Sequence, residues 1–170
     1  MAGYGLPNEQ HLSVVLQNSL EVEGHNIEII NGSVSGSTSA GGLNIAEWTL
    51  SENNIDLMIL CLGANDMLRG INPKETKNNL EEIIKIAKNK NIKVIIAGMI
   101  APNSYGSVYK KSFDKIFSDL SKKYQLQLIP FLLEGVAQKP EFNLSDGMHP
   151  NDQGTIIIGN TLKKAILKNL

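Results

Sequence analysis

The residues best suited to chemistry lie in three short blocks that are far apart along the chain. These blocks cover residues 32–36 (Gly-Ser-Val-Ser-Gly), 63–66 (Gly-Ala-Asn-Asp) and 146–150 (Asp-Gly-Met-His-Pro). Together they offer a backbone N–H donor, a side-chain amide donor, and a carboxylate with an imidazole. Such groups activate a hydroxyl nucleophile and stabilise a tetrahedral oxyanion. No serine suited to the attack itself accompanies them.

The last block places a carboxylate and an imidazole three residues apart, at Asp146 and His149. In a tight turn or at the start of a helix, this spacing puts both side chains on one face. The carboxylate then accepts from one ring nitrogen and leaves the other as a base. The alternative is a plain surface turn at Asp146-Gly147, with His149 as an ordinary exposed residue. His11 and His25 have no suitably placed carboxylate, so we assign both to the surface.

The other two blocks are candidate donors, each with a simpler alternative. Asn65 follows an apolar run, and its amide either points into a site as an oxyanion donor or, with Asp66, caps the next turn. Gly36 lies in a loop rich in serine and threonine. Its N–H is either exposed to an anion or part of an ordinary turn.

Phosphate-binding and metal-binding motifs are not present in complete form. Gly36 and Gly41 have the spacing of a Walker A loop, but Gly42 stands where that motif requires lysine. Three scattered histidines and one cysteine form no metal-ligand set. Cys61 lies in an apolar run, so we interpret it as a buried strand residue rather than a nucleophile. The sequence therefore predicts neither a nucleotide site nor a metal.

The bulk composition predicts one domain spanning residues 1–170, long enough for a full hydrophobic core. A net charge of −1 gives no electrostatic footprint for nucleic acid or an anionic membrane surface. The lysines between residues 85 and 123 are interspersed with acidic residues, as on solvated helix faces. No apolar stretch approaches the ~20 residues of a membrane span, so we expect no integral membrane segment.

Two hydrophobic periodicities alternate along the chain. Helical spacing predicts helices near 9–22, over 43–51, from Pro73 onward, after the loop at 102–106, and from about Asp152 to Leu167. Apolar runs predict strands at 26–30, 56–62, 92–97 and 126–129, with a loop at 31–42. This order is typical of a three-layer α/β/α fold with a parallel, flavodoxin-like sheet. Ligands of such folds bind beyond the carboxyl ends of the strands, where Gly36 and Asn65 are expected.

Taken together, the blocks resemble the SGNH (GDSL-type) hydrolases, and most of all the bacterial branch of acyl-CoA thioesterase I, arylesterase and lysophospholipase L1. Residues 31–38, 62–70 and 146–151 resemble the second, third and last blocks of that family. Residues 2–7 look like the tail of its first block. Each block is only moderately specific, but their order and spacing are typical of the family over nearly the whole chain.

The resemblance implies a role for each matching residue. Gly36 and Asn65 would donate to the oxyanion, His149 would be the base and then the acid, and Asp146 would orient His149. Asp66, Met67 and Leu68 would bind substrate. The family needs no cofactor and cleaves acyl esters, thioesters or lysophospholipids through an acyl-serine intermediate. We expect a small acyl substrate and a monomer.

The family's Gly-Asp-Ser-Leu block is missing, and alignment places its serine just before Met1, together with the first strand of the sheet. Three explanations remain: a start assigned too late or a shortened chain, a degenerate descendant, or a substitute nucleophile. The resemblance thus predicts an esterase or thioesterase that is inactive as given. The alternative is a non-catalytic acyl- or ligand-binding relic of the same fold. A cytoplasmic location fits the sequence as given, and a periplasmic or secreted one fits a lost signal peptide.

Overall fold

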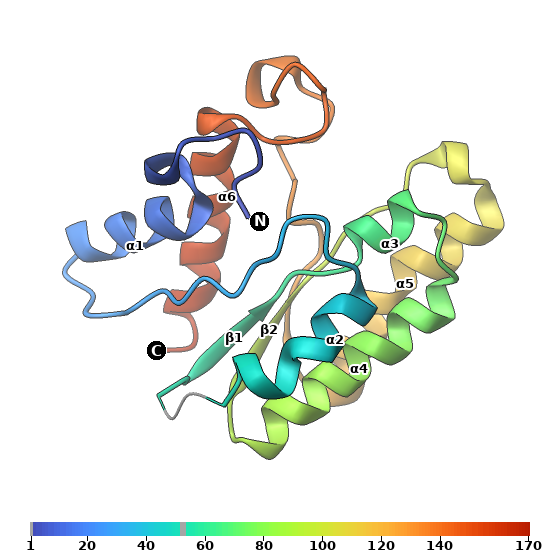
Figure 1. The fold of residues 1–170 in the computed structure, drawn as a ribbon, viewed down its shortest axis with the longest axis horizontal. Helices are drawn as coiled ribbons and strands as arrows, with labels where there is room; N and C mark the ends of the chain where they lie inside the picture. Colours follow the sequence, from blue (N-terminus) through green and yellow to red (C-terminus); the bar gives the residue numbers. More distant parts are fainter. Residues whose placement is uncertain (1, 52–53) are drawn as a thin grey trace. The chain divides into compact units, whose positions relative to one another are not determined.

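The computed structural model describes residues 2–51 and 54–170. It divides these residues into two compact units, one of residues 2–35 with 132–170 and the other of residues 36–131. Figure 1 shows the secondary structure of both. The single domain predicted over residues 1–170 stays a prediction.

The first unit is built on two helices that pack against each other, α1 (Leu12–Val22) and α6 (Asp152–Leu167) (Figure 1). Short 3-10 turns precede them, η1 (Asn8–Gln10) and η3 (Pro140–Phe142). Asn151 caps α6 by accepting from the N–H of Gly154 at 3.0 Å. Apolar side chains at helical spacing form the buried seam between the helices: Leu12, Leu16, Leu20, Ile158, Leu162 and Ile166.

The second unit contains a parallel sheet in the order β1 (Leu57–Leu60), β2 (Lys93–Ala97) and β3 (Gln127–Ile129). Leu57 lies opposite Lys93, and Ile95 lies opposite Gln127. Parallel neighbours need crossover connections, which here contain the helices α3 (Ala64–Leu68), α4 (Pro73–Asn89) and α5 (Ser107–Tyr124) and the 3-10 turn η2 (Asn103–Tyr105). The α/β class and the parallel sheet predicted from the sequence are confirmed.

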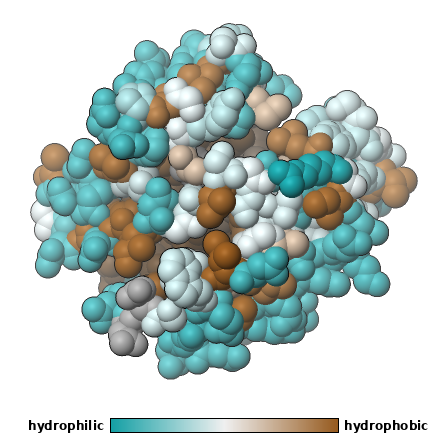
Figure 2. Space-filling view, viewed as in Figure 1, coloured by the Kyte–Doolittle hydropathy of each residue, from teal (hydrophilic) through white to brown (hydrophobic). Residues whose placement is uncertain are grey.

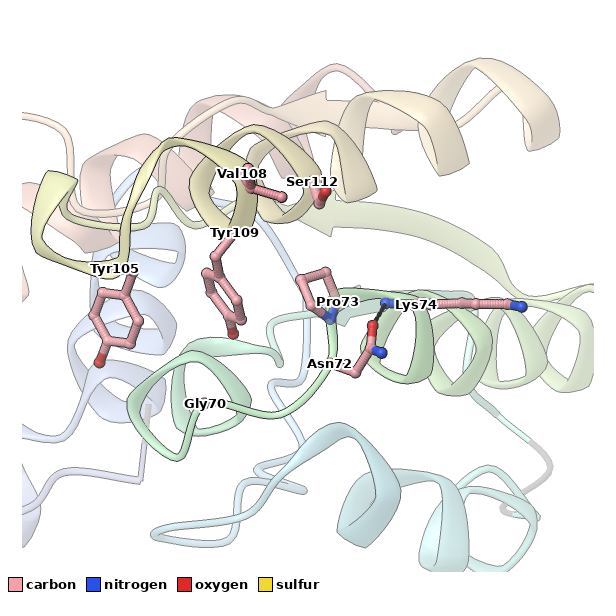
Figure 3. A pocket seen from close by; sticks show the side chains of 8 residues that line it. All are labelled: Gly70, Asn72, Pro73, Lys74, Tyr105, Val108, Tyr109 and Ser112. Atoms are coloured by element: carbon pink, nitrogen blue, oxygen red, sulfur yellow. Dashed lines mark hydrogen bonds between the residues drawn. The ribbon is translucent and has the colours of Figure 1, made fainter.

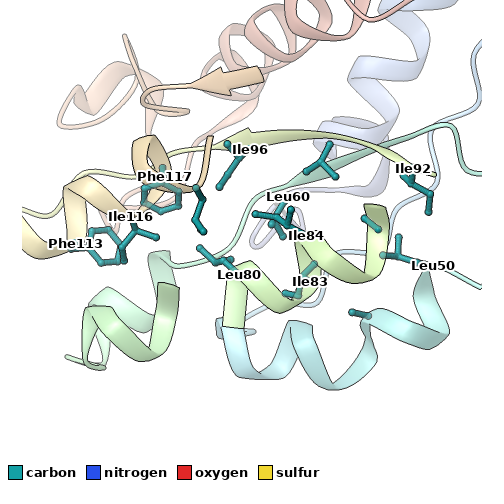
Figure 4. Packing of buried hydrophobic residues seen from close by; sticks show 14 of the residues in the cluster. Leu50, Leu60, Leu80, Ile83, Ile84, Ile92, Ile96, Phe113, Ile116 and Phe117 are labelled. Carbon is teal, nitrogen blue, oxygen red and sulfur yellow. The ribbon is translucent and has the colours of Figure 1, made fainter. Parts of the chain in front are cut away.

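The core of this unit lies between the sheet and the helices α2 (Ser39–Thr49), α4 and α5 (Figure 4). Leu80, Ile84 and Phe113 are fully buried in it. The lysine-rich faces of α4 and α5 are largely exposed, as predicted, and Figure 2 shows a mostly hydrophilic surface over α4. Several of these lysines pair with acidic residues, as Lys77 does with Asp119 at 2.7 Å.

One predicted strand is wrong, and one predicted helix begins earlier than expected. The strand expected at 26–30 is not formed, because the backbone there bonds to a side chain instead of another strand. The Gln17 amide donates to the Ile27 carbonyl and accepts from the Ile29 N–H, both at 2.7 Å. The helix expected over 43–51 is α2, which begins at Ser39, within the predicted loop. Thr38 caps this early start by accepting from the Gly41 N–H at 3.2 Å.

Candidate active site

Asp146 and His149 form a closed turn between η3 and α6. His149 Nδ1 lies 2.7 Å from one Asp146 carboxylate oxygen. The other oxygen accepts from the backbone N–H groups of Met148 and His149, at 2.8 and 2.9 Å. The Leu144 N–H donates to the His149 carbonyl at 2.7 Å and closes the loop. The structure therefore brings the predicted carboxylate and imidazole together, within what is also a surface turn.

The hydrogen bonds at Asp146 set its charge. The backbone N–H of His149, its imidazole and the backbone N–H of Met148 lower the pKa of Asp146 from 3.8 to about 2. An ionised carboxylate beside Nδ1 favours the tautomer in which that nitrogen carries the proton. The His149 side chain is 41% exposed, and its Nε2 atom has no hydrogen-bond partner among the described residues of this unit. Nε2 is thus free to act as a base.

Asn65 lies in the second unit, near the start of α3. Gly63 begins this helix with φ of +111°, a conformation that residues with a side chain rarely adopt. A Cβ atom at Gly63 would also come within 3.3 Å of the Phe117 ring. The half-buried Asn65 amide donates one hydrogen bond to the Ser37 carbonyl at 3.0 Å. This bond fixes the amide and leaves its second N–H for another acceptor.

Arg69, just after α3, holds the Gly36 loop. Its guanidinium donates to the Gly36 carbonyl at 2.9 Å. A bond to that carbonyl restrains the Gly36 backbone and therefore the direction of the donor predicted there. Arg69 lies in a block that resembles the family, but no such role was predicted for it. Its position in Leu68-Arg69-Gly70, directly after the Asn65 block, is the only signal that could have found it.

Asp66 is fully buried and ties together three helices. Its carboxylate accepts from the N–H of Ser39 at 2.7 Å, from the Ser39 hydroxyl, and from the Thr76 hydroxyl at 3.2 Å. Asp66 therefore fastens the starts of α2 and α4 to α3. Met67 is buried as well, and Leu68 is largely exposed. The substrate-binding role predicted for these three residues stays a prediction, and Leu68 is the most accessible of them.

An open cavity of about 620 Å³ lies at the surface beyond the end of α3 (Figure 3). It is lined by Gly70, Asn72, Pro73, Lys74, Tyr105, Val108, Tyr109 and Ser112. The Tyr109 hydroxyl donates to the Ile71 carbonyl at 2.9 Å, and its ring stacks on Tyr105. This cavity was not predictable from the sequence, because its walls come from segments separated by β2.

Other candidate residues are placed less favourably for chemistry. Cys61 is half-buried, and burial raises the pKa of its thiol, which disfavours the thiolate. Ser39 is fully buried against Asp66 and cannot be an accessible substitute nucleophile. Within residues 2–51 and 54–170, no three acidic, histidine or cysteine side chains group as metal ligands do. No helix in the described part of the chain is long and apolar enough to cross a bilayer.

The two halves of the predicted site belong to different units. Asp146 and His149 lie in the first, whereas Asn65 and Gly36 lie in the second. The structure organises each half through its own hydrogen bonds. The convergence of the two halves, expected from the sequence, stays a prediction.

The chain is similar to known proteins over most of its length. Residues 1–155 match the GDSL-like Lipase/Acylhydrolase family. The chain is 36% identical to an arylesterase of Vibrio mimicus, over 99% of this chain and 84% of that protein. It is 32% identical to thioesterase 1/protease 1/lysophospholipase L1 of Escherichia coli K12, over 81% of this chain and 66% of that protein. The crystal structure of TesA matches with a TM-score of 0.93 and 31% identity, covering 99% and 94% of the two chains. The resemblance inferred from the sequence is confirmed.

Proposed function

Because the chain belongs to the GDSL-like lipase/acylhydrolase family, we propose that its site hydrolyses acyl esters or thioesters through an acyl-serine intermediate. The observation that carries the proposal is the Asp146–His149 pair. The 2.7 Å contact at Nδ1 and the lowered pKa of Asp146 together give an oriented imidazole with a free Nε2. Names of the relatives, arylesterase and thioesterase 1 among them, support an acyl substrate.

In the proposed reaction, His149 Nε2 takes the proton of a serine hydroxyl as the serine oxygen bonds to the acyl carbon. The Gly36 N–H and the second N–H of Asn65 stabilise the resulting oxyanion. Nε2 then gives its proton to the departing alcohol or thiol. A water molecule, activated by the same nitrogen, cleaves the acyl-serine and restores the free enzyme. Asp146 stays ionised throughout and stabilises the imidazolium.

The serine of this scheme belongs to the Gly-Asp-Ser-Leu block that the resemblance places before Met1. The proposal therefore requires two protein forms: the 170-residue chain, and the same chain extended by that block and its preceding apolar strand. Loss of a triad serine or histidine costs about 10⁶ in kcat in a serine hydrolase. We expect negligible hydrolysis by the 170-residue chain and measurable turnover of p-nitrophenyl butyrate by the extended one.

The decisive variant is His149→Ala in the extended form, which should lower kcat by about 10⁴–10⁶. His25→Ala is the matched control, because His25 follows α1 and has no part in the scheme, and it should retain full activity. The hydrolase proposal would be refuted if the extended protein did not hydrolyse the ester, or if His149→Ala left its kcat unchanged.

The non-catalytic alternative is favoured by one observation, the cavity beside Tyr105 and Tyr109, which does not require a nucleophile. In this case the 170-residue chain itself binds a fatty acid there, against the rings of Tyr105 and Tyr109. Isothermal titration with dodecanoate should then give heat that disappears in Tyr105→Ala. A heat-silent titration of the 170-residue chain rules out this alternative.

A further inference from the structure

The aromatic ring of Tyr4 lies on the imidazole of His149. The ring centroids are 4.4 Å apart and the planes are inclined by 34°. Both residues belong to the first unit, although 144 positions separate them in the sequence. The Tyr4 hydroxyl makes no hydrogen bond within the described residues, so the contact is made through the ring face. Tyr4 is 59% exposed, too exposed to serve mainly as core.

The segment that carries Tyr4 forms a turn that contacts both the start of α1 and the loop of His149. The Leu6 N–H donates to the Gly3 carbonyl at 3.1 Å, and the His11 ring contacts the Leu6 carbonyl at 3.1 Å. Gly5 has φ of +72°, and a Cβ atom there would approach Leu144 to 2.8 Å. Leu144 belongs to the loop of His149. The turn at residues 3–6 is therefore packed against the loop whose imidazole Tyr4 covers.

The bond to Asp146 does not by itself fix the imidazole. One hydrogen bond at Nδ1 sets the tautomer but permits the ring to rock about that bond. Rocking moves Nε2 out of the position where it would meet a serine hydroxyl. An aromatic ring against one face of the imidazole opposes this motion, because rocking would break the ring contact. Asp146 and Tyr4 thus restrain the ring in different directions.

We propose that Tyr4 is a positioning residue for His149, which holds the plane of the imidazole so that Nε2 keeps one direction. The inference rests on the proposed function for its catalytic consequence, and on the ring contact alone for its structural part. Nothing in the assignment requires the Tyr4 hydroxyl, so phenylalanine should serve as well as tyrosine.

The structural part is tested by NMR on the 170-residue chain, whose three histidines give few imidazole signals. Loss of the aromatic ring in Tyr4→Ala should shift the His149 Hδ2 and Hε1 resonances downfield and leave those of His25 unchanged. Tyr4→Phe should keep the original shifts. Trp48→Ala, which removes a side chain that is 80% exposed in the other unit, should move none of them. If the His149 signals are the same in Tyr4→Ala and the unmodified chain, the proposal is overturned.

The catalytic part is tested in the extended, serine-containing form. An aromatic ring contact is worth about 0.5–1.5 kcal/mol, so Tyr4→Ala should lower kcat about two- to tenfold with little change in KM. Tyr4→Phe should restore the rate. An equal kcat in Tyr4→Ala overturns the positioning role even if the NMR signals move. Failure of the hydrolase proposal is recognised separately, as a lack of any turnover that depends on His149.

Discussion

In the loop that carries His149, every hydrogen bond to the Asp146 carboxylate comes from two or three residues away, whereas the bonds made by the side chains of Asn65, Asp66 and Arg69 span 10 to 33 residues. The first arrangement is exposed and the second includes a fully buried carboxylate. A local turn needs little beyond its own residues to form. The oxyanion half depends instead on the correct packing of α2, α3 and α4. We therefore expect mutations in the Asp146–His149 turn to change mainly the rate, and mutations at buried residues of the other half to change mainly the free energy of unfolding.

The largest effect on stability is expected for Asp66→Ala. It leaves the Ser39 N–H and hydroxyl and the Thr76 hydroxyl without their shared acceptor in the core. Each buried group left unpaired costs about 1–3 kcal/mol, so the free energy of unfolding should fall by about 3–5 kcal/mol in urea titrations. Asp119→Ala is the control, since it removes only a surface partner of Lys77 and should cost less than about 1 kcal/mol. Equal losses in the two variants would contradict the role of Asp66.

Asn65→Ala should separate chemistry from stability in the same unit. In the extended form, removing one oxyanion donor should lower kcat by about 10²–10³. The lost bond to the Ser37 carbonyl should lower the free energy of unfolding by only about 1 kcal/mol. Asn89→Ala, at the exposed end of α4, should change neither quantity. An unaltered kcat in Asn65→Ala would contradict the donor role and leave this residue only its structural bond to the Ser37 carbonyl, since the N-cap of α3 is Gly63 rather than Asn65.

Arg69→Ala tests whether the Gly36 backbone needs support. Its bond to the Gly36 carbonyl is exposed, so we expect a loss of about 1 kcal/mol or less in stability. The effect on kcat should be about three- to tenfold, because the Gly36 donor becomes less well directed. Arg69→Lys should recover part of the rate. A kcat that does not respond to either change would remove Arg69 from the site.

The smallest expected effect is the pH dependence of stability that Asp146 contributes. The pKa of Asp146 is lowered to about 2 by N–H donors and the imidazole of its own turn. Folding thus favours the ionised carboxylate. The resulting stabilisation is complete above about pH 4 and is lost as the pH falls through about 2. Carboxyl ¹³C NMR should show this titration midpoint directly, and Asp146→Asn should remove the corresponding pH dependence of unfolding. A midpoint near 3.8 would mean that the turn is not formed in solution.

The sequence was sufficient for the parts of the fold that depend on local signals. Pro73 marked the first residue of α4, and the apolar stripe from Ile158 to Ile166 marked α6. The strand expected at 26–30 failed because strand formation requires a neighbouring strand, and here the Gln17 side chain takes the backbone bonds. When a side chain ten residues away takes the place of a neighbouring strand, the hydrophobic periodicity of the sequence does not reveal it.

The same distinction applies to the candidate site. Asp146 and His149 were recognisable because their contact is closed within four residues. The burial of Asp66 was not, since a carboxylate in a polar block reads as exposed until its partners on α2 and α4 are known. Tyr4 was seen only as the tail of a matching block. Its contact with His149 joins opposite ends of the chain, and no spacing rule relates them.

The turn at Asp146–His149 is held by hydrogen bonds among its own residues. Because three donors converge on one carboxylate inside a four-residue segment, the arrangement should survive grafting into a loop of another scaffold. For the same reason the turn should form in the 170-residue chain whether or not a serine is present, so that its geometry and the turnover of the extended form can be measured independently.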